Sequence, residues 1–82
     1  MNFYKTAIEE QETVINLCYE EKYLYIYSSK KSIIERLIKK LGKPTKIDTI
    51  KELVTGASWK IPFKQKDKIR IALSKTLLIG QL

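Results

Sequence analysis

The feature that most constrains the fold of this chain is a pair of segments, residues 13–19 and 22–28, in which side chains alternate in character. In the second segment the aliphatic residues Leu24 and Ile26 fall on one side, and three tyrosines fall on the other. A period of two with β-branched and aromatic residues is typical of strands. Because a short polar link over residues 20–22 joins the segments, we expect an antiparallel hairpin with its aliphatic face toward the core.

A helix is predicted directly after this hairpin, over residues 30–41. Its apolar stripe is formed by Ile33, Ile34, Leu37, Ile38 and Leu41, which recur at helical spacing. Ser28 and Ser29 offer a hydroxyl N-cap, since a side-chain oxygen accepts a free backbone N–H. Gly42 suits the position after the last turn, and Pro44 prevents continuation of the helix.

The second half of the chain leaves alternatives open. Residues 46–55 fit an edge strand, which their β-branched residues favour, or a short helix. Gly56 indicates a turn, and a short strand over residues 58–61 follows it. Residues 67–79 fit a second helix, with a strand as the alternative.

These segments predict one α+β domain over residues 1–82, with a small, mostly antiparallel sheet, two helices on one face and the order ββαββα. Residues 1–12 are acidic, and we expect a loosely attached arm, a short strand or one turn of helix there. A chain of this length buries roughly 60–65% of its unfolded surface, so its core is thin.

Charge is distributed very unevenly along the chain. Residues 22–82 contain 15 basic and 4 acidic residues, a net charge of +11, whereas residues 1–21 contain one basic and five acidic residues, a net charge of −4. A small domain with this excess attracts polyanions over long distances. Lysine outnumbers arginine by 14 to 2, which favours point-charge contact with phosphate over base readout.

Two groups of basic residues form the candidate binding surface. The first surrounds the first predicted helix and comprises Lys30, Lys31, Arg36, Lys39, Lys40 and Lys43. The second lies in the last third of the chain and comprises Lys60, Lys64, Lys66, Lys68 and Arg70. The alternative is a solvated face that serves solubility alone. Folding of the acidic N-terminal segment onto these lysines would reduce the exposed positive charge.

The candidate aromatic anchors are Tyr23, Tyr25, Tyr27 and Trp59. On the outer face of a sheet such rings stack on splayed bases or anchor a protein interface. The alternative is that they pack against neighbouring strands and belong to the core.

The composition gives no basis for catalysis or metal binding. The chain has no histidine, which removes the commonest general base and metal ligand. Cys18 is the single cysteine, so it forms no intrachain disulfide, and half-buried packing in a reducing compartment is expected. We therefore expect a non-enzymatic protein without a cofactor or a metal. Because no segment is apolar over the length of a membrane span, we also expect it to be soluble and cytoplasmic, without a membrane partner.

Four short motifs stand out: Glu12-Thr13-Val14-Ile15, Tyr25-Ile26-Tyr27-Ser28-Ser29, Ile34-Glu35-Arg36-Leu37 and Trp59-Lys60-Ile61-Pro62. They resemble an E-T-x-I strand, a V/I-Y-T/S-S strand, an I-x-R/K-L helix and an aromatic-x-V/I-P strand in small phage-encoded proteins of largely uncharacterised function. The segment after Pro62 departs from that pattern. The resemblance implies a phage or prophage origin, and such small non-enzymatic proteins often look like inhibitors of host defence, anti-CRISPR proteins among them.

A binding protein is therefore predicted, with three kinds of partner. The first is a host nucleoprotein or nuclease complex, which an anti-CRISPR inhibitor blocks by occupying its surface. The second is RNA or DNA, bound directly through the phosphate backbone. The third is a further copy of the chain, joined through an exposed strand edge.

Overall fold

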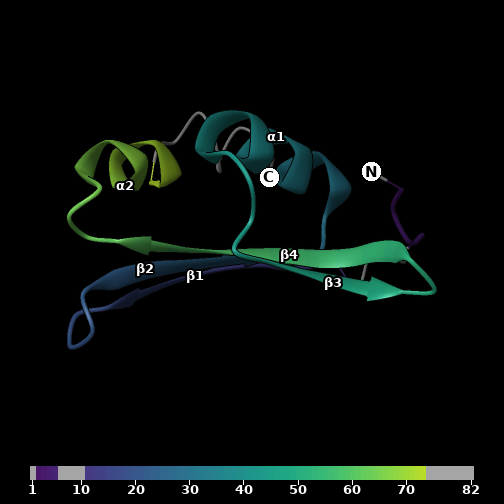
Figure 1. Ribbon diagram of the computed structural model, residues 1–82, viewed down its shortest axis with the longest axis horizontal. Coiled ribbons are helices and arrows are strands. Elements are labelled where there is room, and N and C mark those ends of the chain that lie inside the picture. Colours follow the sequence, from purple (N-terminus) through teal and green to yellow (C-terminus); the bar gives the residue numbers. More distant parts are fainter. Residues whose placement is uncertain (1, 6–10, 74–82) are drawn as a thin grey trace.

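The fold is an antiparallel sheet covered on one face by two helices, in a computed structural model that describes residues 2–5 and 11–73. Its elements in chain order are β1 (Thr13–Cys18), β2 (Tyr23–Ser28), α1 (Lys31–Leu41), β3 (Lys46–Ile50), β4 (Leu53–Pro62) and α2 (Lys66–Ala72). The strand order is β1-β2-β4-β3, and both helices lie on the same face (Figure 1). The predicted α+β class is confirmed.

The predicted hairpin is formed by β1 and β2. Its register pairs Leu24 with Leu17 and Ile26 with Ile15, so these four residues share the helix side of the sheet. Leu24 and Ile26 are fully buried because β2 is a central strand. Ile15 and Leu17 remain 37% exposed, since β1 is an edge strand of the sheet.

Helix α1 begins and ends close to its predicted limits. Its buried residues are Ile33, Ile34, Leu37 and Leu41. Gly42 ends the helix as expected, with a φ of +88° and an N–H that donates to the carbonyl of Ile38. The predicted serine N-cap is wrong, because Lys30 is the N-cap and has no side-chain capping bond. The Ser29 hydroxyl instead accepts the N–H of Glu12, 2.8 Å away, and so ties the start of β1 to the end of β2.

Residues 46–62 form a second hairpin, which confirms a strand at the start of the ambiguous segment. The turn lies at Lys51 and Glu52, whose φ values are +50° and +68°, rather than at Gly56. Positive φ at both central residues is typical of a type I′ hairpin turn, but the Asn-Gly signal for it is missing here. Gly56 lies inside β4, where a side chain would meet Tyr27: a Cβ atom at this position would lie 2.5 Å from the Tyr27 Oη atom.

The N-terminal segment is attached to β4. Phe3 forms a parallel bridge with Val54, and the flanking backbone bonds, Tyr4 N–H to Val54 carbonyl and Val54 N–H to Asn2 carbonyl, are both 2.8 Å long. This edge of β4 is open to the segment because β4 extends beyond the end of β2. Residues 2–4 are therefore not a loose arm, whereas residues 6–10 of the predicted arm lie outside the described residues.

Trp59 belongs to the core and not to the surface. It stands opposite Ile26 on the helix side of β4, and its side chain is 2% exposed. The indole N–H donates to the carbonyl of Gly42, 3.1 Å away, and thereby joins the end of α1 to the sheet. The prediction of Trp59 as a surface anchor is wrong, because β4 is a central strand whose helix side is buried.

The second predicted helix is confirmed over Lys66–Ala72, where the strand alternative is wrong. It packs against α1, and Ala72 is fully buried between the helices and the sheet. Residues 74–79 of the prediction lie outside the described residues.

We expect Gly56→Ala to lower the free energy of unfolding by about 1–3 kcal/mol, the usual cost of overpacking, because the new methyl group meets the Tyr27 ring. In a Tyr27→Ala background the same substitution should cost clearly less, since the ring is absent. Urea unfolding of the four proteins in this double-mutant cycle measures the coupling. An equal cost in both backgrounds would contradict the contact.

Candidate functional site

The basic residues predicted to form a binding surface lie on two opposite sides of the sheet. Ten of them belong to α1, α2 and the adjoining segments on the helix side. Lys60 does not: it stands opposite Tyr25 in β4, between Trp59 and Ile61, whose side chains are buried under the helices. Alternation along the strand therefore directs Lys60 to the face without helices. The prediction that Lys60 joins the other basic residues is wrong for this reason.

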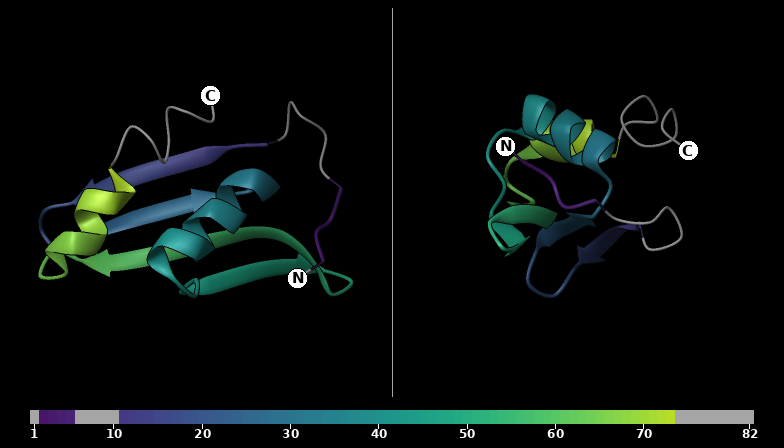
Figure 2. Two further views of the ribbon diagram at one scale, coloured as in Figure 1. Left: turned by 90° about the horizontal axis from the view of Figure 1, so that it is seen from above. Right: turned by 90° about the vertical axis from the view of Figure 1, so that its right-hand side faces the viewer.

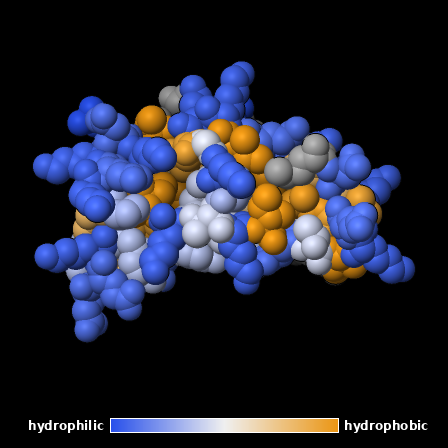
Figure 3. Space-filling model, in the orientation of Figure 1, coloured by the Kyte–Doolittle hydropathy of each residue, from blue (hydrophilic) through white to orange (hydrophobic). Residues whose placement is uncertain are grey.

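We call the ten remaining side chains the basic helix layer. They are Lys30, Lys31, Arg36, Lys39, Lys40, Lys43, Lys64, Lys66, Lys68 and Arg70. Together with Glu35 and Asp67, the acidic residues of the same two stretches, they give a net charge of +8. All except Lys30 and Arg36 are exposed. In Figure 3 hydrophilic side chains cover the end of the molecule at which α2 lies.

The exposed lysines of this layer, Lys31, Lys39, Lys40, Lys43, Lys64, Lys66 and Lys68, have no carboxylate partner among residues 2–5 and 11–73. An ion pair between Lys46 Nζ and Asp48 Oδ1, 3.7 Å apart, lies in β3 and outside the layer. The ammonium of Lys31 lies 5.6 Å from the centroid of the Phe3 ring. Exposed ammonium groups that lie close together without counter-charges create a positive potential that a polyanion relieves.

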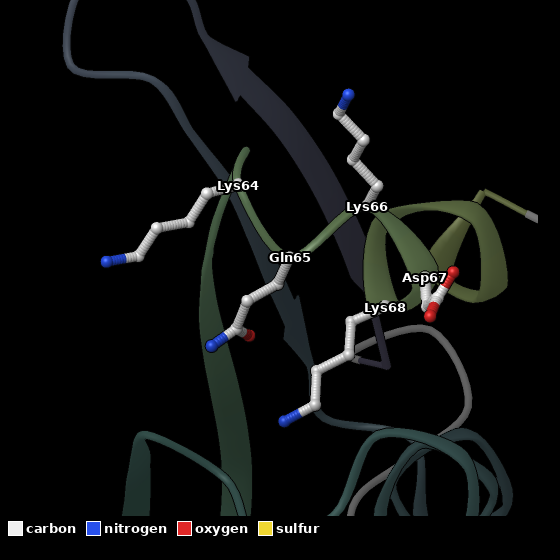
Figure 4. Close-up of a pocket in the computed structure, with 5 residues that line it drawn as sticks. All are labelled: Lys64, Gln65, Lys66, Asp67 and Lys68. Carbon is white, nitrogen blue, oxygen red and sulfur yellow. The ribbon is translucent and has the colours of Figure 1, made fainter.

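An open depression of about 390 Å³ lies where the chain enters α2. It is lined by Lys64, Gln65, Lys66, Asp67 and Lys68. Figure 4 shows the side chains of Lys64, Gln65 and Lys68 extending to one side. The Asp67 carboxylate is turned away from the amines of Lys64 and Lys68. A shallow site lined by amines suits phosphate groups on an extended polymer better than an enclosed small molecule.

The opposite side of the sheet carries the predicted row of tyrosines. We call it the aromatic sheet face; its central residues are Tyr23, Tyr25, Tyr27, Ser58, Lys60 and Pro62, with Val14, Asn16 and Cys18 of β1 beside them. No helix of the described residues covers this face (Figure 2). The three tyrosines and Cys18 are half-buried, which confirms that the tyrosines point away from Leu24 and Ile26.

Two of the three tyrosine rings have defined contacts. The ammonium of Lys60 lies 4.3 Å from the centroid of the Tyr23 ring, which is a cation–π contact. The Tyr27 ring lies against the backbone at Gly56, where a Cβ atom would come within 2.8 Å of Cε1. Sequence reasoning missed this role of Gly56, because a glycine between two possible strands more often indicates a turn.

Carboxylates act on two of these three rings. Desolvation raises the pKa of Tyr27, and the Asp48 and Glu12 carboxylates raise it further. Desolvation also raises the pKa of Tyr23, with smaller contributions from the Cys18 thiol and the Glu21 carboxylate. Both phenols are therefore neutral at physiological pH.

Within residues 2–5 and 11–73, no three His, Cys, Asp or Glu side chains are grouped so that they would hold a metal ion. None of the described helices has the length and apolar character needed to cross a membrane.

Comparison with known proteins adds no assignment. No protein-family model, curated protein or solved structure matches the chain. The resemblance to phage-encoded proteins remains a prediction. The basic helix layer and the aromatic sheet face are the features that bear on function.

We expect the protein to lose stability as the pH rises above about 10, the pKa of a tyrosine in an unfolded chain. The raised pKa of Tyr27 means that the folded state keeps this proton longer than the unfolded state. Its contribution is therefore complete below the unfolded pKa and is lost as the pH rises through the folded pKa. Urea unfolding between about pH 8 and pH 11 should show a smaller loss for Tyr27→Phe than for the unmodified protein. Parallel curves would contradict this explanation.

Proposed function

We propose that this protein is a non-enzymatic binding domain that contacts the phosphate backbone of a nucleic acid through its basic helix layer. The observation that supports this proposal is the set of exposed lysines on α1 and α2 without carboxylate partners in the described part of the chain. Lysine contributes a flexible point charge, so the contacts position the protein on phosphates and read no base sequence.

The nucleic acid in this proposal belongs to a host nucleic-acid-targeting complex in the cytoplasm, and the bound protein blocks that complex. A domain of 82 residues acts in this way by stoichiometric occupancy, as anti-CRISPR inhibitors do. The resemblance of the strand and helix motifs to phage-encoded proteins supports this version.

Direct binding of free RNA or DNA is the second candidate. The open depression at the start of α2 favours it, because three lysines there reach solvent without any need for a protein partner. Release of counterions from the phosphates would supply the free energy of binding.

Titration with single- and double-stranded RNA and DNA of equal length, at several salt concentrations, tests the phosphate contact. Affinity should fall steeply with salt, and Lys66→Gln with Lys68→Gln should reduce the salt slope by about 2. The matched control is Lys22→Asn with Lys51→Asn, which removes the same charge at two turn residues of positive φ, where asparagine is tolerated. The control should keep the slope of the unmodified protein.

A cleavage assay with RNA-guided and other nucleic-acid-targeting nucleases separates the two candidates. Inhibition at stoichiometric amounts, lost in the Lys66/Lys68 variant, supports the blocking role. Tight binding of free nucleic acid without inhibition of any nuclease would leave only the second candidate. Absence of both binding at low salt and inhibition would contradict the whole proposal.

A further inference from the structure

The aromatic sheet face differs from the rest of the molecule in its charge. Two of its cations have partners: Lys46 is paired with Asp48, and Lys60 lies over the Tyr23 ring. The carboxylates that act on its tyrosines come from Asp48, Glu12 and Glu21. A chain whose residues 22–82 carry a net charge of +11 thus has one face where aromatic rings and carboxylates are combined.

This combination attracts cations. The face of an aromatic ring carries negative electrostatic potential, and nearby carboxylates add to it. The contact between Lys60 and Tyr23 shows that an ammonium group already occupies one of the three rings. Tyr25 and Tyr27 are half-buried on the same strand face, with the Asp48 side chain 44% exposed near Tyr27.

A nucleic acid fits this face less well than a basic protein segment does. Its phosphates would meet Asp48 and Glu12 beside Tyr27, and these like charges repel them. Arginine fits better, because its planar guanidinium stacks on a ring and forks onto a carboxylate at the same time.

We propose that the aromatic sheet face docks an arginine-bearing segment of a partner protein, with a guanidinium stacked on the Tyr25 and Tyr27 rings and paired with Asp48. The contact of Lys60 with Tyr23 is an example, within the chain itself, of a cation on a ring of this face. Together with the proposed phosphate contact, this docking gives the protein two faces of opposite preference, one for a polyanion and one for a polycation. This inference does not depend on the phosphate contact of the basic helix layer, which other residues make.

An NMR titration of the ¹⁵N-labelled protein tests this docking site. The probe is a synthetic peptide of alternating arginine and glycine, and its control replaces arginine by citrulline, which has the same shape without the charge. The arginine peptide should shift the amide signals of β2 and β4, and the citrulline peptide should not. Tyr25→Leu and Asp48→Asn should each weaken binding about two- to fivefold, the usual size of such contacts.

Lys60→Ala should change the affinity in opposite directions for a face that binds arginine and for a face that binds polyanions. Removal of this ammonium frees the Tyr23 ring, so the affinity for the arginine peptide should rise about two- to fivefold. Lys51→Asn removes the same charge at the β3–β4 turn, far along the sheet from Tyr23 (Figure 1), and should raise the affinity less. A face that binds polyanions would instead lose affinity for a single-stranded oligonucleotide in Lys60→Ala.

Four results of these titrations would overturn the proposal, and a fifth comes from the free protein. They are unchanged β2 and β4 signals with the arginine peptide, equal shifts with the citrulline peptide, equal effects of Lys60→Ala and Lys51→Asn, and shifts on this face with an oligo-dT strand. Signals of this face that change with protein concentration alone would identify a second copy as its occupant and would also overturn it. None of these outcomes affects the salt-dependence test with Lys66 and Lys68.

Discussion

The pairing of β2 with β4 is the constraint on which the rest of the structure depends. These two central strands place Leu24, Ile26 and Trp59 on one side, where α1 and α2 bury them. Burial of such side chains contributes about 1.5–3 kcal/mol each, so a slip of one residue, which would exchange the two faces, is strongly disfavoured. The same register therefore holds Tyr25 and Lys60 on the face without helices.

The register also separates the charges of the molecule. Helices α1 and α2 carry their lysines outward, because their apolar stripes must face the sheet. Glu12, which precedes β1, and Asp48, within β3, act instead on the tyrosine row. A net charge of +7 for the whole chain thus conceals one strongly basic side and one side where carboxylates lie among aromatic rings. Two surfaces of different chemistry suit the binding role that we propose.

Much of the architecture was predictable, because local patterns and tertiary packing agree. The alternation in β2 and the apolar stripe of α1 each indicate a single buried face. The β3–β4 turn was missed since Lys51 and Glu52 carry no glycine or asparagine signal for their positive φ. Gly56 was misread for the converse reason: it is a glycine inside a strand, required by a ring from the neighbouring strand.

The amino-acid sequence by itself determined the class of fold, the face of the tyrosine row and the excess of positive charge, because periodicity and composition are local properties. Only the tertiary structure decided that Trp59 is buried, that Lys60 lies apart from the other basic residues, and that carboxylates approach the tyrosines. Each of these depends on which strands are neighbours and which face the helices cover. Those relations arise between residues far apart in the chain, and no window of sequence contains them.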